Sequence, residues 1–556
     1  MNGICNFDWS AAAAKPEYTA LIEELTQIYE SECKTPIPQL TYEMFMEFSK
    51  TGIRSGYENA YFARRRRLGA LGALSLLYPD NKEYFAAMQA LLWEICAECT
   101  WCVPAHVYYA KNAEERVTTI DLFSAETGFE LSEILSLFGG RLDAILADRL
   151  RYEIKRRVTD PFIAKKSVWE DYRTNWAAIC GGYVGGCFLY SDPERFELAE
   201  PRIERAMQMF LSGMSGDGAC LEGVSYWGAG FGVFCLYYAL KEELRPGGRD
   251  IFAEEKVERI SQFFQYACFK NAMALTFSDA QPKAVYCLHI LHFLKRKYGD
   301  KIKVPPFCFH MPMRRCRLNG ILRAFLYYSP EDNEPRIADF LHYFPEAQML
   351  VLSQSRYEFA VKAGHNDEPH NHNDVGSFLF AVDGVQYLCD IGVGVYTKDY
   401  FGKDTRYKLI GNGSQGHCVP IIDGKYQSVG GEYRAKNVSF DGECFTADIG
   451  GAYEGAYSAV RKITLLENGI RLCDSFSGVK ESLTERFVSY LEPELLEDRV
   501  RIGRAEIRYS SESMKCVYSC EQYENNFMGR VPIYLIDFIA LHNPNETYTF
   551  DIIAAE

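Results

Sequence analysis

The side chains best suited to chemistry form a histidine cluster at the start of a predicted β-hairpin. Three of the chain's ten histidines, among them His370 and His372, fall within residues 364–380. An apolar run follows and returns through an Asp-Gly turn, which is a hairpin signal. Because side chains alternate along an extended segment, we expect His370 and His372 to project to the same side. With Asp390 closing the second strand and His417 after a glycine-rich loop, His372 has the partners of a zinc site, and His370 is free beside it.

The spacing of these candidate ligands leaves the metal an open question. The separations between His372, Asp390 and His417 match no compact zinc motif, and a single histidine is more often a satisfied surface or core residue. Polar residues this dense beside an apolar strand would be costly to bury without partners. A shared ligand or substrate is therefore the simpler interpretation of the cluster.

A second group of candidate residues lies in the glycine-rich loop 216–230. Glycines are poor helix residues, so the pattern indicates a loop kept open for close backbone approach. Tyr226 in this loop could move a proton if a nearby cation or metal lowered its pKa, and otherwise it packs the loop. Upstream, Asn175 stands just ahead of a predicted helix. Asn175 is interpreted either as the N-cap of that helix or as an amide that binds a substrate carboxylate.

Secondary candidates are scattered along the chain. Trp101 and His106 follow a helix end and could line a sugar subsite, or they belong to a plain connecting loop. Arg406 could hold a carboxylate or sulfate through a bidentate fork, or form a structural salt bridge. Glu222 and Asp279 complete this group as acidic candidates.

The first half of the chain has a helical apolar period almost throughout residues 18–298. Breaks are expected at 80–81 and 139–140, and Pro201 and Pro246 are expected at turns. Helices of similar length joined by loops that bear aromatic residues predict paired hairpins around an axis, an incomplete (α/α) toroid. The predicted helices are 61–78, 82–99, 125–137, 141–158, 177–190, 202–214, 228–240, 254–270 and 283–298.

The second half changes to short alternating runs separated by Asp-Gly and Asn-Gly turns. This pattern predicts a large antiparallel β-sandwich, and the fold class is α+β with two domains, 1–305 and 306–556. The predicted strands are 349–353, 359–362, 377–382, 434–440, 444–449, 459–466, 469–476, 483–490, 505–509 and 547–553.

Composition narrows the function classes. The chain has 556 residues, a net charge of -15 and 14% aromatic residues, so it is a folded protein that does not bind nucleic acid. The arginine run 64–67 is expected on a solvated helix face. No apolar run is long enough to span a membrane, and no leader is visible, so we expect a cytoplasmic protein unless a leader was removed. Scattered cysteines indicate reduced thiols, and the sequence leaves a homo-oligomer open.

Taken together, these motifs resemble the heparinase II/III family of polysaccharide lyases, over roughly residues 60–480. The motifs are Asn175-Trp176, the loop 217–226 and the stretch 370–378. Such enzymes join an (α/α) toroid to a β-sandwich and cleave uronate polysaccharides by β-elimination. The resemblance implies that Asn175 neutralises the uronate carboxylate and that Tyr226 and His370 are the acid and base. It also implies that His372, Asp390 and His417 hold a structural Zn²⁺.

One departure from the family concerns the residue after the asparagine. Some members place a histidine there, whereas this chain has Trp176, which we expect in the substrate-binding group with Glu222. This feature is closer to heparinase III-like and exolytic members. The expected substrate is an anionic, uronate-containing oligo- or polysaccharide.

Two other functions remain open at this point. A glycoside hydrolase on a helical toroid would need two facing carboxylates, and Asp217 with Glu222 is the best pair in the sequence. A non-catalytic carbohydrate-binding scaffold would bind sugars without turnover. In the lyase, Tyr226 could serve both steps when proton and leaving group share a face, whereas opposite faces would make His370 the base.

Overall fold

The structure is a computed structural model that describes residues 3–283, 288–306, 317–335 and 338–555. The chain divides into two compact units. The first contains Met1–Met214, Trp227–Glu254 and Val285–Pro335, and the second contains Ser215–Tyr226, Glu255–Ala284 and Arg336–Glu556. Two segments from the predicted helical half, including the loop with Tyr226, therefore belong to the second unit.

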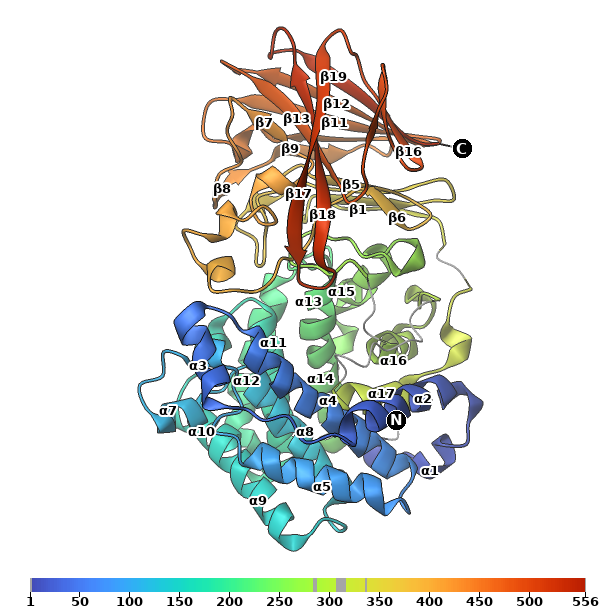
Figure 1. Cartoon of the computed structure of the whole chain (residues 1–556). Helices are drawn as coiled ribbons and strands as arrows, with labels where there is room; N and C mark the ends of the chain where they lie inside the picture. The colour runs from blue at the N-terminus through green and yellow to red at the C-terminus, as the bar shows by residue number, and fades with distance from the viewer. Residues whose placement is uncertain (1–2, 284–287, 307–316, 336–337, 556) are drawn as a thin grey trace. The chain divides into compact units, whose positions relative to one another are not determined.

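The first unit is an incomplete helical toroid (Figure 1). Its central helix, α11, packs against α8, α12 and α14, and α4 packs against α5 and α17. Residues 284–287 of the predicted helix 283–298 lie outside the described residues. The longer helices are α2 (Thr19–Ile28), α3 (Tyr42–Thr51), α4 (Ser55–Leu77), α5 (Lys82–Cys96), α8 (Leu122–Phe138), α9 (Ala144–Ile154), α11 (Asn175–Ser191), α12 (Phe196–Gly213), α14 (Gly232–Leu244), α16 (Leu288–Tyr298) and α17 (Leu318–Tyr327).

Close packing of α11 depends on its glycines. A Cβ atom at Gly186 would lie 2.3 Å from the ring of Phe129 on α8, and one at Gly185 would lie 2.5 Å from Tyr237 on α14. Carbon atoms do not approach that closely, so side chains at these positions would push the neighbouring helices away. The glycines hold α11, and with it Asn175 at its first turn, in the centre of the unit.

Two expectations for this unit were wrong. Pro201 does not lie at a turn but inside α12, on an exposed face, where it removes one backbone donor from the helix. The arginine run is not a solvated face, because Arg64, Arg65 and Arg67 are buried. Arg65 makes a bidentate pair with the buried carboxylate of Glu98, at 2.7 Å for both bonds. Specific carboxylate and carbonyl partners allow these charges to be buried.

The second unit is a β-sandwich whose named strands pair antiparallel. A five-stranded sheet contains β1 (Phe340–Phe344), β2 (Met349–Ser353), β3 (Glu358–Lys362), β5 (Phe378–Val382) and β6 (Val385–Leu388). An eight-stranded sheet contains β14 (Glu494–Leu495), β15 (Arg499–Ile502), β16 (Ala505–Arg508), β19 (Thr547–Ala554), β12 (Gly469–Ser477), β11 (Ser458–Leu466), β10 (Cys444–Asp448) and β9 (Lys436–Phe440). A four-stranded sheet contains β17 (Met514–Asn525), β18 (Gly529–Ala540), β13 (Leu483–Ser489) and β7 (Pro420–Ile422), and β4 (His365–Asn366) pairs with β8 (Gly430–Arg434).

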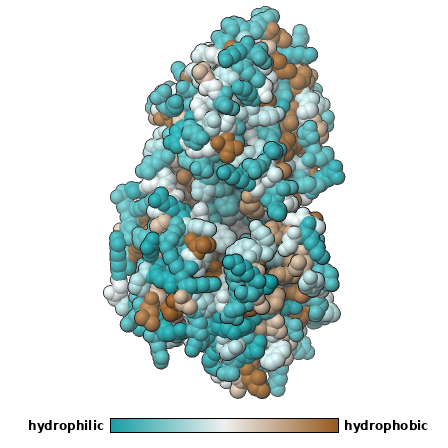
Figure 2. All heavy atoms as spheres, turned by 90° about the vertical axis from the view of Figure 1, so that its left-hand side faces the viewer, coloured by the Kyte–Doolittle hydropathy of each residue, from teal (hydrophilic) through white to brown (hydrophobic). Residues whose placement is uncertain are grey.

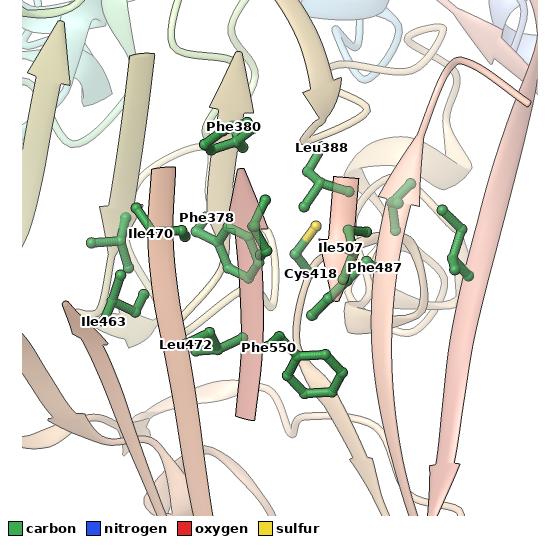
Figure 3. Packing of buried hydrophobic residues seen from close by; sticks show 14 of the residues in the cluster. Phe378, Phe380, Leu388, Cys418, Ile463, Ile470, Leu472, Phe487, Ile507 and Phe550 are labelled. Carbon is green, nitrogen blue, oxygen red and sulfur yellow. The ribbon is translucent and has the colours of Figure 1, made fainter. Parts of the chain in front are cut away.

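These sheets share one apolar core, part of which is shown in Figure 3. The ring of Phe487 on β13 lies 5.5 Å from Phe378 on β5 and 5.2 Å from Phe550 on β19. Three sheets therefore meet at one aromatic contact. Arg461 is buried beside this core, pairs with Asp474 and donates to the carbonyls of Gly376 at 2.7 Å and Cys418 at 2.8 Å. These two bonds hold the chain just after the histidine loop and just after His417.

Hydrophobic and hydrophilic side chains are mixed on the face shown in Figure 2, where hydrophobic residues form separate patches among hydrophilic ones. Within the described part of the chain, no helix has both the length and the apolar character needed to cross a bilayer.

Candidate active site

The predicted hairpin after the histidine cluster is confirmed as β5 and β6, but the cluster itself is not extended. His370 has a φ of 57°, in the left-handed region, so strand alternation does not explain where its side chain points. The loop is instead held by ion pairs to Lys362 on β3. This buried lysine lies 3.3 Å from Glu368 and 3.0 Å from Asp374, one on each side of the histidines.

The three predicted metal ligands come together. His372, Asp390 and His417 are fully buried, and one candidate ligand atom from each lies within 4.8 Å of the other two. Nδ1 of His417 lies 3.0 Å from Oδ2 of Asp390, and Nδ1 of His372 lies 3.8 Å from Oδ1. The loops that follow β4 and β6 and the residues before β7 supply the three side chains.

The donor set fits a zinc ion. Nδ1 of His372, Oδ2 of Asp390 and both ring nitrogens of His417 are buried without a hydrogen bond of acceptable geometry. Burial alone would lower the pKa of His372, but the carboxylates of Asp279 and Asp390 outweigh it and raise that pKa to about 9. The pocket thus favours a positive charge beside Asp390, and imidazole and carboxylate are ligands that zinc accepts.

A second cluster of polar side chains surrounds Asp279, next to the three candidate metal ligands. Asp279 lies in an irregular segment after α15 (Glu255–Tyr266), and its side chain is 0% exposed. Its Oδ2 atom is 2.8 Å from Nδ1 of His370, and its Oδ1 atom is 3.1 Å from Nε2 of His372. One carboxylate therefore bridges the candidate catalytic histidine and a candidate metal ligand. The expectation that His370 is free beside the zinc ligands was therefore wrong, because Asp279 binds it.

Further donors surround the same carboxylate. The hydroxyl of Tyr400 donates to Oδ1, that of Tyr396 donates to Oδ2 at 3.3 Å, and Nη2 of Arg406 lies 3.5 Å from Oδ1. Burial alone would raise the pKa of Asp279, but the histidine hydrogen bonds and the charge of Arg406 hold it well below its usual range. Arg406 also donates to the carbonyls of Tyr400 and Asn371. These bonds favour a structural role for Arg406 over binding of a substrate carboxylate or sulfate.

Tyr226 lies directly against His370. Their rings are stacked, with centroids 4.0 Å apart and an interplanar angle of 21°. The hydroxyl of Tyr226 is 2.7 Å from that of Tyr396. Burial, followed by the charge of Asp279, raises the pKa of Tyr226 above its usual value. The nearby cation does not reverse this effect, so Tyr226 is a neutral phenol that can give a proton.

The loop that carries Tyr226 is fixed to the segment that carries Asp279. The hydroxyl of Ser278 donates to the carbonyl of Leu221 at 3.1 Å, and Gly223, with a φ of 96°, would place a Cβ atom 3.1 Å from the carbonyl of Phe277. Ser278 itself has a φ of 60°. The glycine in this loop thus permits close approach of the chain's own backbone, and the conformations next to Asp279 and at His370 are sparsely populated ones.

The carboxylates proposed for a hydrolase do not form a facing pair. Oδ2 of Asp217 accepts the backbone N–H groups of Glu346 at 2.7 Å and Ala347 at 3.0 Å, so it stabilises a turn. Glu222 is buried, and its Oε2 atom lies 3.7 Å from Nε2 of His370. Glu222 therefore belongs to the same cluster as His370, as a neighbour of the imidazole.

The remaining candidates lie in the helical unit. Asn175 is the first residue of α11 and is buried, whereas the N-cap is Thr174, which makes no side-chain cap bond, so the N-cap reading of Asn175 was wrong. Next to it, the ring of Trp176 is 5.0 Å from His106 and 6.5 Å from the exposed Tyr172. These partly accessible aromatic rings form a platform suited to a sugar.

Trp101 does not belong to that platform. Only 1% of its surface is exposed, its indole donates to the carbonyl of Ile95, and the guanidinium of Arg157 lies 4.9 Å from its ring centroid. A sugar has no access to the ring, so the substrate-binding prediction for Trp101 is corrected to a core role.

Sequence reasoning missed Tyr396 and Tyr400 and gave Asp279 no role. Tyr396 and Tyr400 follow Asp390 closely, in a stretch without strand alternation. The one usable signal is two tyrosines four residues apart, just after a candidate metal ligand. That signal is weak because this chain has 37 tyrosines.

Comparison with known proteins gives a likeness in fold. No family model and no curated protein matches the sequence. Among solved structures, heparinase III superposes with a TM-score of 0.62 at 11% identity, covering 97% of this chain and 92% of that one. Heparan sulfate lyase HepC from Pedobacter heparinus gives 0.58 at 12% identity, covering 96% and 87%. Chondroitin AC lyase from Streptomyces coelicolor A3, in complex with chondroitin sulphate, gives 0.57 at 10% identity, covering 99% and 82%. The chain therefore has the toroid and β-sandwich fold of these glycosaminoglycan lyases.

Proposed function

We propose that this protein is a polysaccharide lyase that cleaves uronate-containing glycans by β-elimination. The observation that carries the proposal is the stacked pair of Tyr226 and His370, with the imidazole tied to the buried Asp279. The fold adds support, because the solved neighbours are named as heparinase, heparan sulfate lyase and chondroitin lyase.

The reaction needs a base, an acid and a group that accepts developing charge. Removal of the C5 proton of a uronate moves negative charge onto its carboxylate, and a neutral amide directed at that group stabilises the transition state. We assign this task to Asn175, a buried amide at the start of α11. The C4 oxygen leaves with the glycan chain and must receive a proton.

We assign the base to His370 and the acid to Tyr226. The hydrogen bond from Nδ1 of His370 to Asp279 leaves Nε2 with the lone pair that accepts the C5 proton. The raised pKa of Tyr226 keeps its phenol protonated, as a general acid requires. Because the two rings are stacked 4.0 Å apart, the base and the acid would approach the sugar from one side, so these roles suit a uronate whose C5 proton and leaving group lie on the same face.

Zinc is part of the proposal in a structural role. His372, Asp390 and His417 would hold it, and when bound it would supply a fixed positive charge that orders the histidine loop. The three side chains are fully buried, so we assign them no contact with substrate.

The helical unit supports a proposal for how the glycan binds and where it is cleaved. Trp176 and His106 offer ring faces to a sugar, and the resemblance to exolytic members leads us to propose that short products are released from chain ends. The size distribution of early products separates this mode from internal cleavage.

The direct test is a panel of heparan sulfate, chondroitin, hyaluronan, alginate and other uronates, incubated with the full chain. A lyase generates an unsaturated uronate that absorbs in the ultraviolet, and Tyr226→Phe should reduce its formation by about 10²–10⁴-fold. Tyr357→Phe is the matched control, because it removes a buried hydroxyl bonded to the carbonyl of Leu466 in the same unit. That variant should keep its activity.

Other products would point to other functions. A product with added water and no double bond would identify a hydrolase. Binding that survives Tyr226→Phe, with no turnover of any uronate by the wild-type protein, would identify a carbohydrate-binding scaffold. Either result overturns the proposed lyase.

A further inference from the structure

We propose that Asp279 is a positioning residue that orients His370 and His372 together and so couples the candidate zinc cluster to the general base. This inference rests on the proposed function and extends it to a residue that does not touch substrate. The side chain of Asp279 is 0% exposed, so its effect on the reaction must pass through its neighbours.

The two oxygens of Asp279 serve different histidines. Oδ2 accepts from Nδ1 of His370 at 2.8 Å, and Oδ1 accepts from Nε2 of His372 at 3.1 Å. A carboxylate only accepts, so both of these ring nitrogens must carry a proton. The two bonds therefore place the lone pair of His370 on Nε2, which lies 3.7 Å from Oε2 of Glu222, and that of His372 on Nδ1, the atom that would bind a metal.

The surroundings fix the carboxylate itself. The hydroxyls of Tyr396 and Tyr400 and the guanidinium of Arg406 approach it from the segment after Asp390. From the other side, Ser278 ties the backbone next to Asp279 to the loop of Tyr226. Asp279 can therefore rotate only if several hydrogen bonds break together, and this rigidity is what a positioning group requires.

The coupling has a direction that can be tested. With a metal on its other ring nitrogen, His372 would present Nε2–H to Asp279, and the carboxylate would then be oriented to accept from His370. We expect disturbance of Asp279 to lower kcat, because the base is misdirected, and to leave KM nearly unchanged, because the substrate platform is untouched.

Asp279→Asn is the decisive variant. The amide keeps the shape of the side chain but presents an N–H group to one of the two imidazoles, which selects the wrong tautomer. We expect kcat to fall about 10²-fold or more, with KM within about threefold of wild type. Zinc content by elemental analysis should stay close to that of wild type.

A double-mutant cycle separates positioning from general damage. If Asp279 acts through His370, the variant with both Asp279→Asn and His370→Ala should be about as slow as His370→Ala alone. Glu98→Gln is the matched control, since it removes the charge of a buried carboxylate that pairs with Arg65 in the helical unit. It should lower the melting temperature and leave kcat within about threefold.

The histidine tautomer provides a measurement that needs no variant at position 279. In protein labelled with ¹⁵N-histidine, with the His370 signal assigned by comparison with His370→Gln, we expect the proton on Nδ1. A proton on Nε2 instead would overturn the inference even if Asp279→Asn does not fold.

The remaining outcomes are distinct. Absence of unsaturated product from the wild-type protein removes the proposed function, and the inference with it. Given an active wild type, the inference fails if Asp279→Asn retains kcat, if its effect adds to that of His370→Ala, or if lost zinc alone accounts for the effect and added zinc restores the rate.

Discussion

Each unit of the molecule contains a histidine bound to a buried aspartate, and the two pairs have nearly the same length. Nδ1 of His106 is 2.7 Å from Asp121 in the helical unit, and Nδ1 of His370 is 2.8 Å from Asp279 in the sheet unit. Oδ1 of Asp121 accepts the backbone N–H groups of Phe123 and Ser124, so this aspartate caps α8. Asp279 instead collects side chains: two histidines, two tyrosines and an arginine.

The difference shows that the length of a His–Asp bond does not reveal its role. What distinguishes the pairs is the task of the second oxygen. At Asp121 it stabilises a helix start, whereas at Asp279 it reaches a second imidazole that belongs to the candidate metal cluster. A helix cap is typical of an aspartate that stabilises the fold, whereas a bridge between two imidazoles is typical of an aspartate that organises a functional site.

The largest expected contrast is between the two histidines. His370→Ala should lower kcat by about 10²–10⁴-fold because it removes the base, whereas His106→Ala should mainly raise KM. Steady-state rates of ultraviolet absorbance increase measure both. Equal losses of kcat in the two variants would contradict the assignment of the base.

Removal of the metal should produce the next largest effect. Treatment with a strong chelator, or His417→Ala, should reduce zinc content and lower kcat by about 10–100-fold through loss of order in the histidine loop. Added zinc should restore the chelated wild type and not the variant. Full activity in protein that elemental analysis shows to be free of metal would remove zinc from the site.

A smaller effect is expected at the aromatic platform. Trp176→Ala should raise KM about tenfold, the equivalent of one aromatic stacking contact, and leave the melting temperature almost unchanged. Trp101→Ala is the contrasting variant, since it empties a core position and should mainly destabilise the fold by about 3–5 kcal/mol. Calorimetry and kinetics on the two proteins test this separation.

The smallest effect is expected at the helix cap. Asp121→Asn can still cap α8, because asparagine is a good N-cap residue, whereas Asp121→Ala should cost about 1 kcal/mol of unfolding free energy. Neither substitution removes a group that we assign to the reaction. A loss of kcat in Asp121→Asn comparable with that of Asp279→Asn would erase the distinction between the two pairs.

Much of the fold could be predicted from periodicity. The helix predicted at 82–99 is found at Lys82–Cys96, and the strand predicted at 469–476 is found at Gly469–Ser477. The two longest strands, β17 and β18, were missed, because β17 is exposed along most of its length and lacks alternation between apolar and polar residues. Pairing with a neighbour rather than burial defines that strand, and a single sequence does not display its partner.

The site was predictable only in part. His372, Asp390 and His417 could be grouped because each lies at the end of a recognisable loop or strand, and the structure brings them together. The role of Asp279 could not be found, since it is 91 residues from His370 and lies in a segment without regular structure. The burial of Arg65 was equally hidden, because its partner Glu98 lies on another part of the chain.

Gly223 has a consequence for any mutational survey of this protein. A Cβ atom at this position would lie 3.1 Å from the carbonyl oxygen of Phe277 and 3.4 Å from Cβ of Ala280, so the tyrosine-bearing loop has little room there for a side chain against the aspartate-bearing segment. A single methyl group at position 223 would spread these two strips of polypeptide and displace donor and anchor together. Loss of turnover there would come from a residue that has no functional group at all.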